Sequence, residues 1–131
     1  MGWRGETIFC DDIRIENTGK HILIGVYGVD LLPSFLPVNV TLGAWVRFSG
    51  LEKGQKRYSL RLKGPSGSEV LSLDGETEIL RSDDPTIFSL LPIPVNIDQT
   101  GSITLEFGFD GEPCVEIGRL RVSPPQDFQD S

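Results

Sequence analysis

Apolar residues recur at every second position along three segments of this chain, and this period-two pattern constrains the fold more than any other feature. Every second side chain is apolar in residues 38–48, 57–63 and 103–109. A β-strand points successive side chains to opposite faces, so each segment is predicted to be a half-buried strand. No segment carries a convincing apolar stripe at the 3.6-residue period of a helix. The chain is therefore predicted to be all-β.

Glycine and proline divide the chain into pieces of strand length. Fifteen glycines and nine prolines punctuate it, at a spacing typical of a sandwich or barrel. Turn residues at 17–19, 65–67 and 110–111 each predict a hairpin. We expect about eight strands in an antiparallel two-sheet β-sandwich of immunoglobulin-like architecture. Residues 1–123 are expected to form this single domain, and residues 124–131 a polar C-terminal tail.

Three irregularities interrupt the alternation. The apolar parity switches at residues 11–12 and again at Gly118, and one extra residue at each place predicts a β-bulge. Pro92 and Pro94 fall within the apolar segment 88–95. Because proline cannot donate to a ladder, the later half of that segment is predicted to be an edge.

The composition excludes some classes of partner. The 131 residues include 19 acids and 12 bases, with a net charge of −7, so a basic nucleic-acid surface is not expected. No signal peptide and no apolar run of membrane-spanning length is evident. We therefore expect a cytoplasmic protein with neither nucleic-acid nor membrane partners. Cys10 and Cys114 are then expected to be free thiols, with a disulfide between them as the alternative.

The N-terminal region carries a charged signature, which reads Cys10-Asp11-Asp12-Ile13-Arg14-Ile15-Glu16, then Gly19-Lys20, then Ile24-Gly25-Val26-Tyr27. It resembles the opening signature of a family of small bacterial proteins that has no established activity. The resemblance implies a β-rich domain and nothing catalytic. Two interpretations stay open for the charged members: a network that fixes the strand register, or a recognition site. These members are Asp11, Asp12, Arg14, Glu16 and Lys20.

Catalytic and metal sites have little support. His21 is the only histidine, and a dyad with Cys10 would need a thiol that we expect to be buried and inert. Zinc would need four ligands, and the chain holds only three Cys and His residues in total. We expect no enzyme and no cofactor. Calcium stays open as an alternative if acidic loops meet. The candidate ligands are Asp11, Asp12, Asp83, Asp84 and Asp110.

Outward-facing basic residues and a tryptophan suggest a contact surface. Trp45 and Arg47 point outward from one predicted strand, and Arg57, Arg61 and Lys63 from another. If these strands are neighbours, the bases surround a tryptophan, and Trp and Arg are the residues that anchor interfaces. We therefore predict a non-catalytic module that presents this face, or a strand edge, to a protein partner or a second copy.

Two alternatives to this contact surface stay open. In the first, Trp45 is merely packed under the aliphatic stems of Arg47 and Arg61. In the second, the protein is a ligand-binding sandwich for calcium or carbohydrate, with Trp45 stacked on a sugar ring and the acidic loops supplying oxygen ligands.

Overall fold

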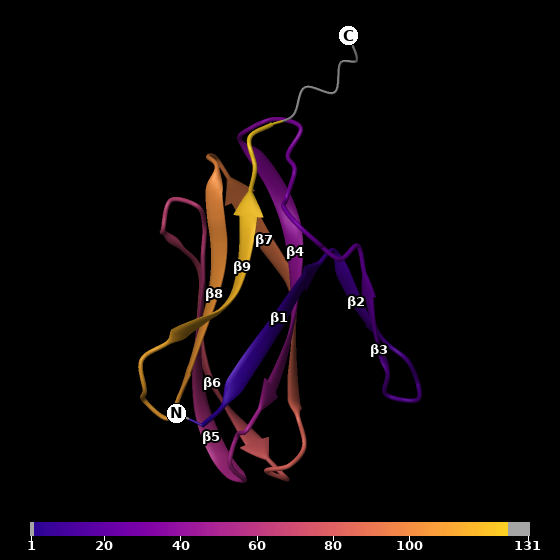
Figure 1. The fold of residues 1–131 in the computed structure, drawn as a ribbon, viewed down its shortest axis with the longest axis vertical. Helices are drawn as coiled ribbons and strands as arrows, with labels where there is room; N and C mark the ends of the chain where they lie inside the picture. The colour runs from indigo at the N-terminus through magenta and orange to yellow at the C-terminus, as the bar shows by residue number, and fades with distance from the viewer. Residues whose placement is uncertain (1, 126–131) are drawn as a thin grey trace.

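A computed structural model describes residues 2–125 as an all-β protein with nine strands in three antiparallel sheets (Figure 1). The all-β prediction is confirmed, with nine strands rather than about eight. Residues 126–131 of the predicted tail lie outside the described residues. The strands are β1 (Arg4–Cys10), β2 (Asp12–Ile15), β3 (His21–Ile24), β4 (Val38–Ser49), β5 (Gly54–Lys63), β6 (Glu69–Ile79), β7 (Thr86–Ile97), β8 (Gly101–Phe109) and β9 (Val115–Val122).

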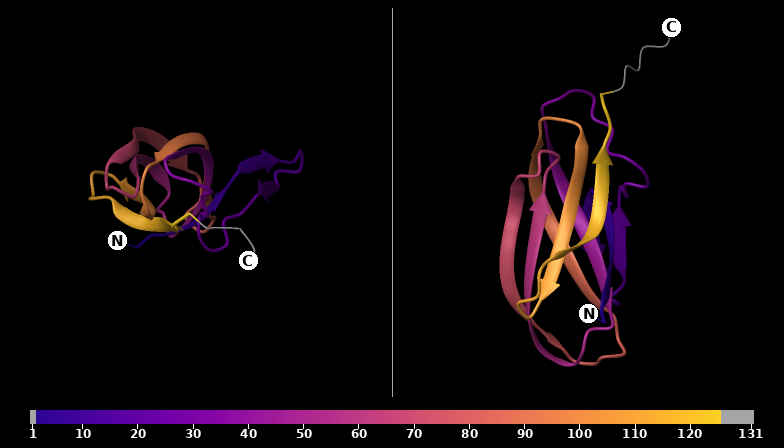
Figure 2. Two further views of the ribbon diagram at one scale, coloured as in Figure 1. Left: turned by 90° about the horizontal axis from the view of Figure 1, so that it is seen from above. Right: turned by 60° about the vertical axis from the view of Figure 1, so that its left-hand side comes forward.

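The two larger sheets pack face to face around one core (Figure 2). Their strand orders are β1-β4-β7 and β6-β5-β8-β9. The inward positions of the alternating segments supply the core: Phe48 of β4 meets Phe107 of β8 with ring centroids 4.9 Å apart. Edge-to-face aromatic contacts of this kind add to the burial of apolar area. Among residues 2–125, no helix is long and apolar enough to cross a membrane.

The local turn predictions are confirmed. Hairpins join β2 to β3, β5 to β6 and β8 to β9 at the three predicted turns. The β8–β9 register shifts beside Gly118, as the parity switch predicts. A Cβ atom on Gly118 would lie 2.7 Å from Thr7 of β1, so glycine at the bulge allows β1 to cross closely. β7 is an edge strand, also as predicted, and its pairing with β4 is irregular between Leu42 and Ala44.

The predicted bulge at residues 11–12 is wrong. β1 ends at Cys10 and β2 begins at Asp12 in a separate sheet, so the chain leaves the sandwich at this point. The Asp11 N–H donates to the carbonyls of Ile24 and Gly25 at 2.9 and 3.1 Å, and these bonds close the base of the β2–β3 hairpin. We call this hairpin, residues 12–24, the arm. It extends away from the side of the sandwich (Figures 1 and 2).

The segment after the arm, residues 25–37, runs back along the sandwich to the start of β4. The Tyr27 N–H donates to the Phe9 carbonyl at 2.9 Å. Further along, Leu31 forms a parallel bridge with Val122 of β9. Asp30 accepts a hydrogen bond from Arg121 Nε at 2.9 Å. These contacts fasten the segment, which we call the return segment, to both β1 and β9.

Candidate functional site

Three residues of the N-terminal signature, Asp11, Gly25 and Tyr27, build the base of the arm. Gly25 has a φ of +69°, a conformation that glycine adopts without the Cβ penalty. A Cβ atom there would collide with the Asp11 carboxylate. Burial raises the pKa of Tyr27, and the charge of Asp11 and a hydrogen bond with it raise this pKa further. Asp11, Gly25 and Tyr27 therefore form one packed joint between β1 and the arm.

The remaining charged members of the signature pair within the arm. Arg14 Nε lies 2.6 Å from Asp12 Oδ2, and this hydrogen bond lowers the pKa of Asp12. Lys20 Nζ lies 3.4 Å from Glu16 Oε1 across the hairpin turn. Both pairs are local and exposed. They favour the interpretation that the signature shapes the arm.

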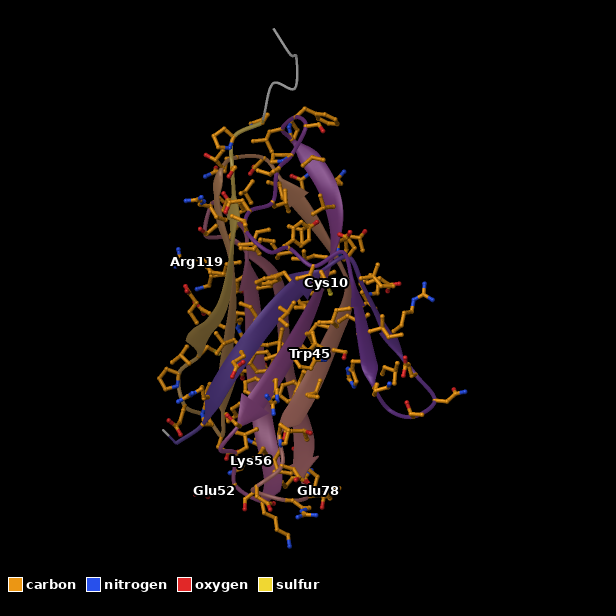
Figure 3. The ribbon with its side chains drawn as sticks, turned by 45° about the vertical axis from the view of Figure 1, so that its right-hand side comes forward. Cys10, Trp45, Glu52, Lys56, Glu78 and Arg119 are labelled. Carbon is orange, nitrogen blue, oxygen red and sulfur yellow. The ribbon has the colours of Figure 1, made fainter. Side chains whose placement is uncertain are left out.

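Trp45 lies under the arm. It faces outward from β4, on the side of the sandwich from which the arm projects (Figure 3). Its Nε1–H donates to His21 Nδ1 at 2.9 Å, and the two rings meet edge to face at 6.1 Å between centroids. The indole is half-buried. A side chain of the arm, rather than the stem of Arg61 from the other sheet, therefore shields Trp45.

The expected cluster of bases around Trp45 does not form. β4 carries Trp45 and Arg47 in the three-stranded sheet, whereas β5 carries the other bases in the four-stranded sheet. The short connection over residues 50–53 crosses between the sheets instead of turning back as a hairpin. Arg57, Arg61 and Lys63 therefore point outward on the opposite side of the sandwich from Trp45.

The bases on the outer face of β5 face acids on neighbouring strands. Arg57 lies 3.8 Å from Glu76, and Arg61 lies 3.3 Å from Asp74. Lys63 lies 3.4 Å from Glu106. We call this set of cross-strand pairs, together with Arg61–Glu69 at 3.8 Å, the ion-pair ladder. Because each base lies beside a carboxylate, this face does not present the strongly positive surface that the sequence suggested.

The structure does not assemble the acidic loops into a calcium site. Asp12 pairs with Arg14, and Asp110 lies 3.2 Å from Lys56. Asp83 and Asp84 both lie beside Arg81, at 3.3 and 3.4 Å. Within residues 2–125, no group of three or more His, Cys, Asp or Glu side chains gathers where a metal ion would bind. These four carboxylates instead lie beside basic side chains.

Neither cysteine lies in a setting that activates a thiol. Cys10 is fully buried, and burial raises the pKa of its thiol, as do the charges of Asp11 and Asp12. Burial also raises the pKa of Cys114. Both are free cysteines. Since the thiolate is the nucleophile, a raised pKa keeps each in its inert form. His21, the candidate base, is already hydrogen-bonded to Trp45.

A hollow of about 300 Å³ lies at the end of the sandwich where β1 begins. Trp3, Leu51 and Phe109 line it, together with the Lys56–Asp110 ion pair. The Trp3 Nε1 atom is buried without a hydrogen-bond partner among residues 2–125. The hollow is at the lower end of the size range of small-molecule sites, and the sequence analysis did not anticipate it.

Exposed apolar side chains concentrate on the arm and the return segment, which the sequence analysis also missed. Of eleven exposed large apolar side chains within residues 2–125, seven lie between positions 15 and 35. They are Ile15, Ile22, Ile24, Val26, Val29, Leu32 and Phe35. We call these seven the apolar patch.

The register of the arm explains part of this patch. Ile22 pairs with Arg14 and Ile24 with Asp12, on the opposite face of the arm from the buried Ile13. The signal was present in the sequence, because apolar residues of both parities occur in one short hairpin.

A family model described as "Family of unknown function (DUF6941)" matches residues 7–123, and the chain therefore belongs to this family. The matched range begins within β1 and ends just after β9, so it includes the arm. None of the curated proteins matches the chain. The resemblance seen in residues 10–27 agrees with this result to the extent that both point to a family without a known function.

Proposed function

We propose that this family member is a non-catalytic, cytoplasmic protein-interaction module of bacterial origin, and that its contact surface is the apolar patch. The single observation behind this proposal is the concentration of seven exposed large apolar side chains within positions 15–35. Exposed apolar side chains that gather on one face, as Ile22 and Ile24 do on the arm, are typical of sites where another protein binds. The partner is a different protein or a second copy of this chain.

The construction of the arm supports this role. Its base is held by Asp11 and Gly25, and its inner face by the His21–Trp45 hydrogen bond. Its outer face carries Ile22 and Ile24, with exposed fractions of 41% and 45%. A contact surface that is already ordered loses less conformational entropy on binding, so more of the burial energy contributes to affinity.

The strand order supports an immunoglobulin-like arrangement of the sandwich. In that fold, strands A, B and E share one sheet and strands C, F and G share the other. β1, β4 and β7 take the places of A, B and E, and β5, β8 and β9 those of C, F and G. β6 then corresponds to strand C′ beside C, and the arm is an insertion between A and B. Because this architecture serves many functions, the functional proposal rests on the surface alone.

The residues first suggested as contacts take new roles in this proposal. Trp45 acts by holding the arm through His21, and Arg47 lies beside it on the same outer face. Arg57, Arg61 and Lys63 belong to the ion-pair ladder on the other side. The ladder therefore supplies matched control positions for any test of the apolar patch.

The test is capture of partners from a lysate of the source organism at pH 7.5 with two double variants as bait. Ile22→Asp/Ile24→Asp charges the outer face of the arm, and Arg57→Ala/Arg61→Ala removes two ladder bases. Both baits must first melt close to the unaltered protein. We expect a prey that the arm variant loses, with affinity at least thirtyfold weaker, equivalent to about 2 kcal/mol. Size-exclusion chromatography of the same variants reports self-association. A prey or dimer lost only with the ladder variant would contradict the proposal.

A further inference from the structure

We propose that His21 and Trp45 form a pH-controlled latch, which holds the arm against the three-stranded sheet at neutral pH and releases the tip of the arm on acidification. This inference rests on the proposed function in one respect: release of the arm matters for binding only if the arm is the contact surface. The latch itself concerns the isolated protein.

The hydrogen bond fixes the protonation state of the closed latch. An indole N–H can only donate, so the His21 Nδ1 atom, 2.9 Å from Trp45 Nε1, must accept and must carry no proton. The ring proton of neutral His21 therefore lies on Nε2. A second proton can add only at Nδ1, and it turns this acceptor into a donor that faces another donor.

The geometry of the two rings also disfavours a positive charge on His21 while the hydrogen bond is in place. The His21 and Trp45 rings meet at an interplanar angle of 75°, and the N–H edge of the indole points at the imidazole. The edge of an aromatic ring carries the positive end of its quadrupole. An imidazolium ion would therefore face both a competing donor and a positive edge.

The elements packed around His21 offer little compensation for a new positive charge. On the arm, Ile15 lies opposite His21, and the flanking Glu16 and Lys20 already pair with each other. On β1, the residue opposite Trp45 is Ile8. On β7, the residue opposite Trp45 is Ser89.

The same outer face of the sheet carries two charged residues near Trp45 in the register, Arg47 and Glu6. They lie opposite each other in the β1–β4 register, two residues beyond the Trp45–Ile8 pair, and β7 places Ile87 beside Arg47. In the part of the chain that the structure describes, no carboxylate lies within ion-pair distance of His21. Protonation therefore removes a hydrogen bond and creates no ion pair in its place.

The consequence is confined to the outer half of the arm. Ile13 is buried near the base, with an exposed fraction of 7%, whereas Ile15 is 64% exposed. Asp11 and Gly25 keep the base closed independently of His21. Loss of the latch therefore leaves the base attached and frees residues 15–21 at the tip. A partner that needs an ordered arm would then bind more weakly at acid pH, because it must order the tip itself.

The direct test is a ¹⁵N NMR titration of the isolated protein between pH 8 and pH 5, the range in which histidine changes its charge. At pH 8 we expect His21 to be the Nε2–H tautomer and the Trp45 indole proton to be shifted by its hydrogen bond. On acidification we expect that indole resonance to move with the His21 ring nitrogens. After correction for intrinsic exchange, amide protection in residues 15–21 should fall by about tenfold, while protection in β8 stays unchanged.

Two variants control this experiment. His21→Gln keeps a side-chain acceptor that does not titrate, so its arm should stay protected at both pH values. His21→Ala leaves no acceptor for Trp45, so its arm should be loose even at pH 8. A His21 Nδ1–H tautomer at pH 8, unchanged protection at pH 5, or the same acid response in His21→Gln would overturn the latch.

The outcomes separate the latch from the proposed function. The titration needs no partner, so a latch that opens while the apolar patch captures nothing would refute only the binding role. Capture that depends on Ile22 and Ile24 at pH 7.5 and is equally strong at pH 5.5, with a titration that leaves the arm unchanged, would refute only the latch.

Discussion

The two outer faces of this sandwich expose different kinds of side chain. On the four-stranded sheet, bases and acids of neighbouring strands pair across the surface, as Arg61 does with Asp74 at 3.3 Å. On the three-stranded sheet, the arm lies over Trp45 and presents Ile22 and Ile24 to the surroundings. The first face satisfies its polar groups with its own residues. The second leaves apolar side chains exposed to water, and exposed apolar groups of this kind are the basis of the proposed contact surface.

This contrast shows why residue type alone did not predict the surroundings of the exposed side chains. Arg and Trp are common interface anchors, and they drew attention to β4 and β5. In the folded chain, the β5 bases lie beside acids, and Trp45 donates a hydrogen bond to His21. The exposed surface of the arm comes instead from isoleucines whose sequence pattern resembles that of ordinary core residues.

Among the substitutions that test this contrast, we expect the largest loss of stability at the base of the arm. Gly25→Ala places a Cβ atom against Asp11 and also forces a left-handed conformation on alanine, so we expect the free energy of unfolding of the arm to fall by about 2–3 kcal/mol. The matched control is Gly19→Ala, because Gly19 has a φ of +89° with open space around it and should cost about 1 kcal/mol. Native-state hydrogen exchange of β2 and β3 measures both. Equal losses would show that the Asp11 contact is unimportant.

A smaller effect follows from removing the indole under the arm. Trp45→Ala deletes a half-buried ring and the hydrogen bond to His21, and we expect stability to fall by about 2 kcal/mol. Arg47→Ala, two residues along on the same outer face, is the control and should change stability by less than about 0.5 kcal/mol. Urea denaturation measures the difference. A Trp45 variant as stable as the Arg47 variant would mean that the arm does not pack there.

The ion-pair ladder should contribute little to stability. Arg57 and Glu76 are 80% and 59% exposed at 3.8 Å, and water and salt screen such a pair. A double-mutant cycle with Arg57→Ala and Glu76→Ala should give a coupling energy below about 0.5 kcal/mol. A coupling several times larger would make the ladder a structural feature and weaken its use as a control face.

The smallest expected effect concerns the attachment of the return segment to β9. Hydrogen bonds from Arg121 and then Ser123 lower the pKa of Asp30. A lowered folded-state pKa means that this carboxylate stabilises the fold at pH values above its ordinary pKa, and that the contribution disappears as the pH falls through the lowered value. Asp30→Asn should therefore melt slightly below the unaltered protein at pH 7, and the difference should shrink as the pH falls below the ordinary pKa of an aspartate. A difference that is the same at every pH would point to a role other than charge.

The sequence was informative about strands and turns because their signals are local. Alternation in residues 38–48 and turn residues such as those at 65–67 act within a few positions, so their structures could be predicted. The sheet to which each strand belongs depends on contacts that are distant in sequence. Nothing local distinguishes the crossing connection at residues 50–53 from a hairpin loop, and the predicted cluster of Trp45 with the β5 bases was wrong for that reason.

The hairpin at residues 17–19 was predicted, but its departure from the sandwich was missed for a related reason. A parity switch at residues 11–12 has the same appearance in sequence whether a strand bulges or the chain leaves its sheet. Which of these two structures forms depends on the packing of Asp11 against Gly25 and on the hydrogen bond between His21 and Trp45, which are 24 residues apart. Neither contact has a signature that one sequence reveals.

The most direct test of the account is a hydrogen-exchange footprint of the protein with a captured partner bound, compared with the free protein at pH 7.5. If the apolar patch is the contact surface, protection should increase in the arm and in residues 25–35, and the amides of β5 should exchange as before. Increased protection in β5, around Arg57, Arg61 and Lys63, with an unchanged arm would contradict the account and return the contact surface to the charged face.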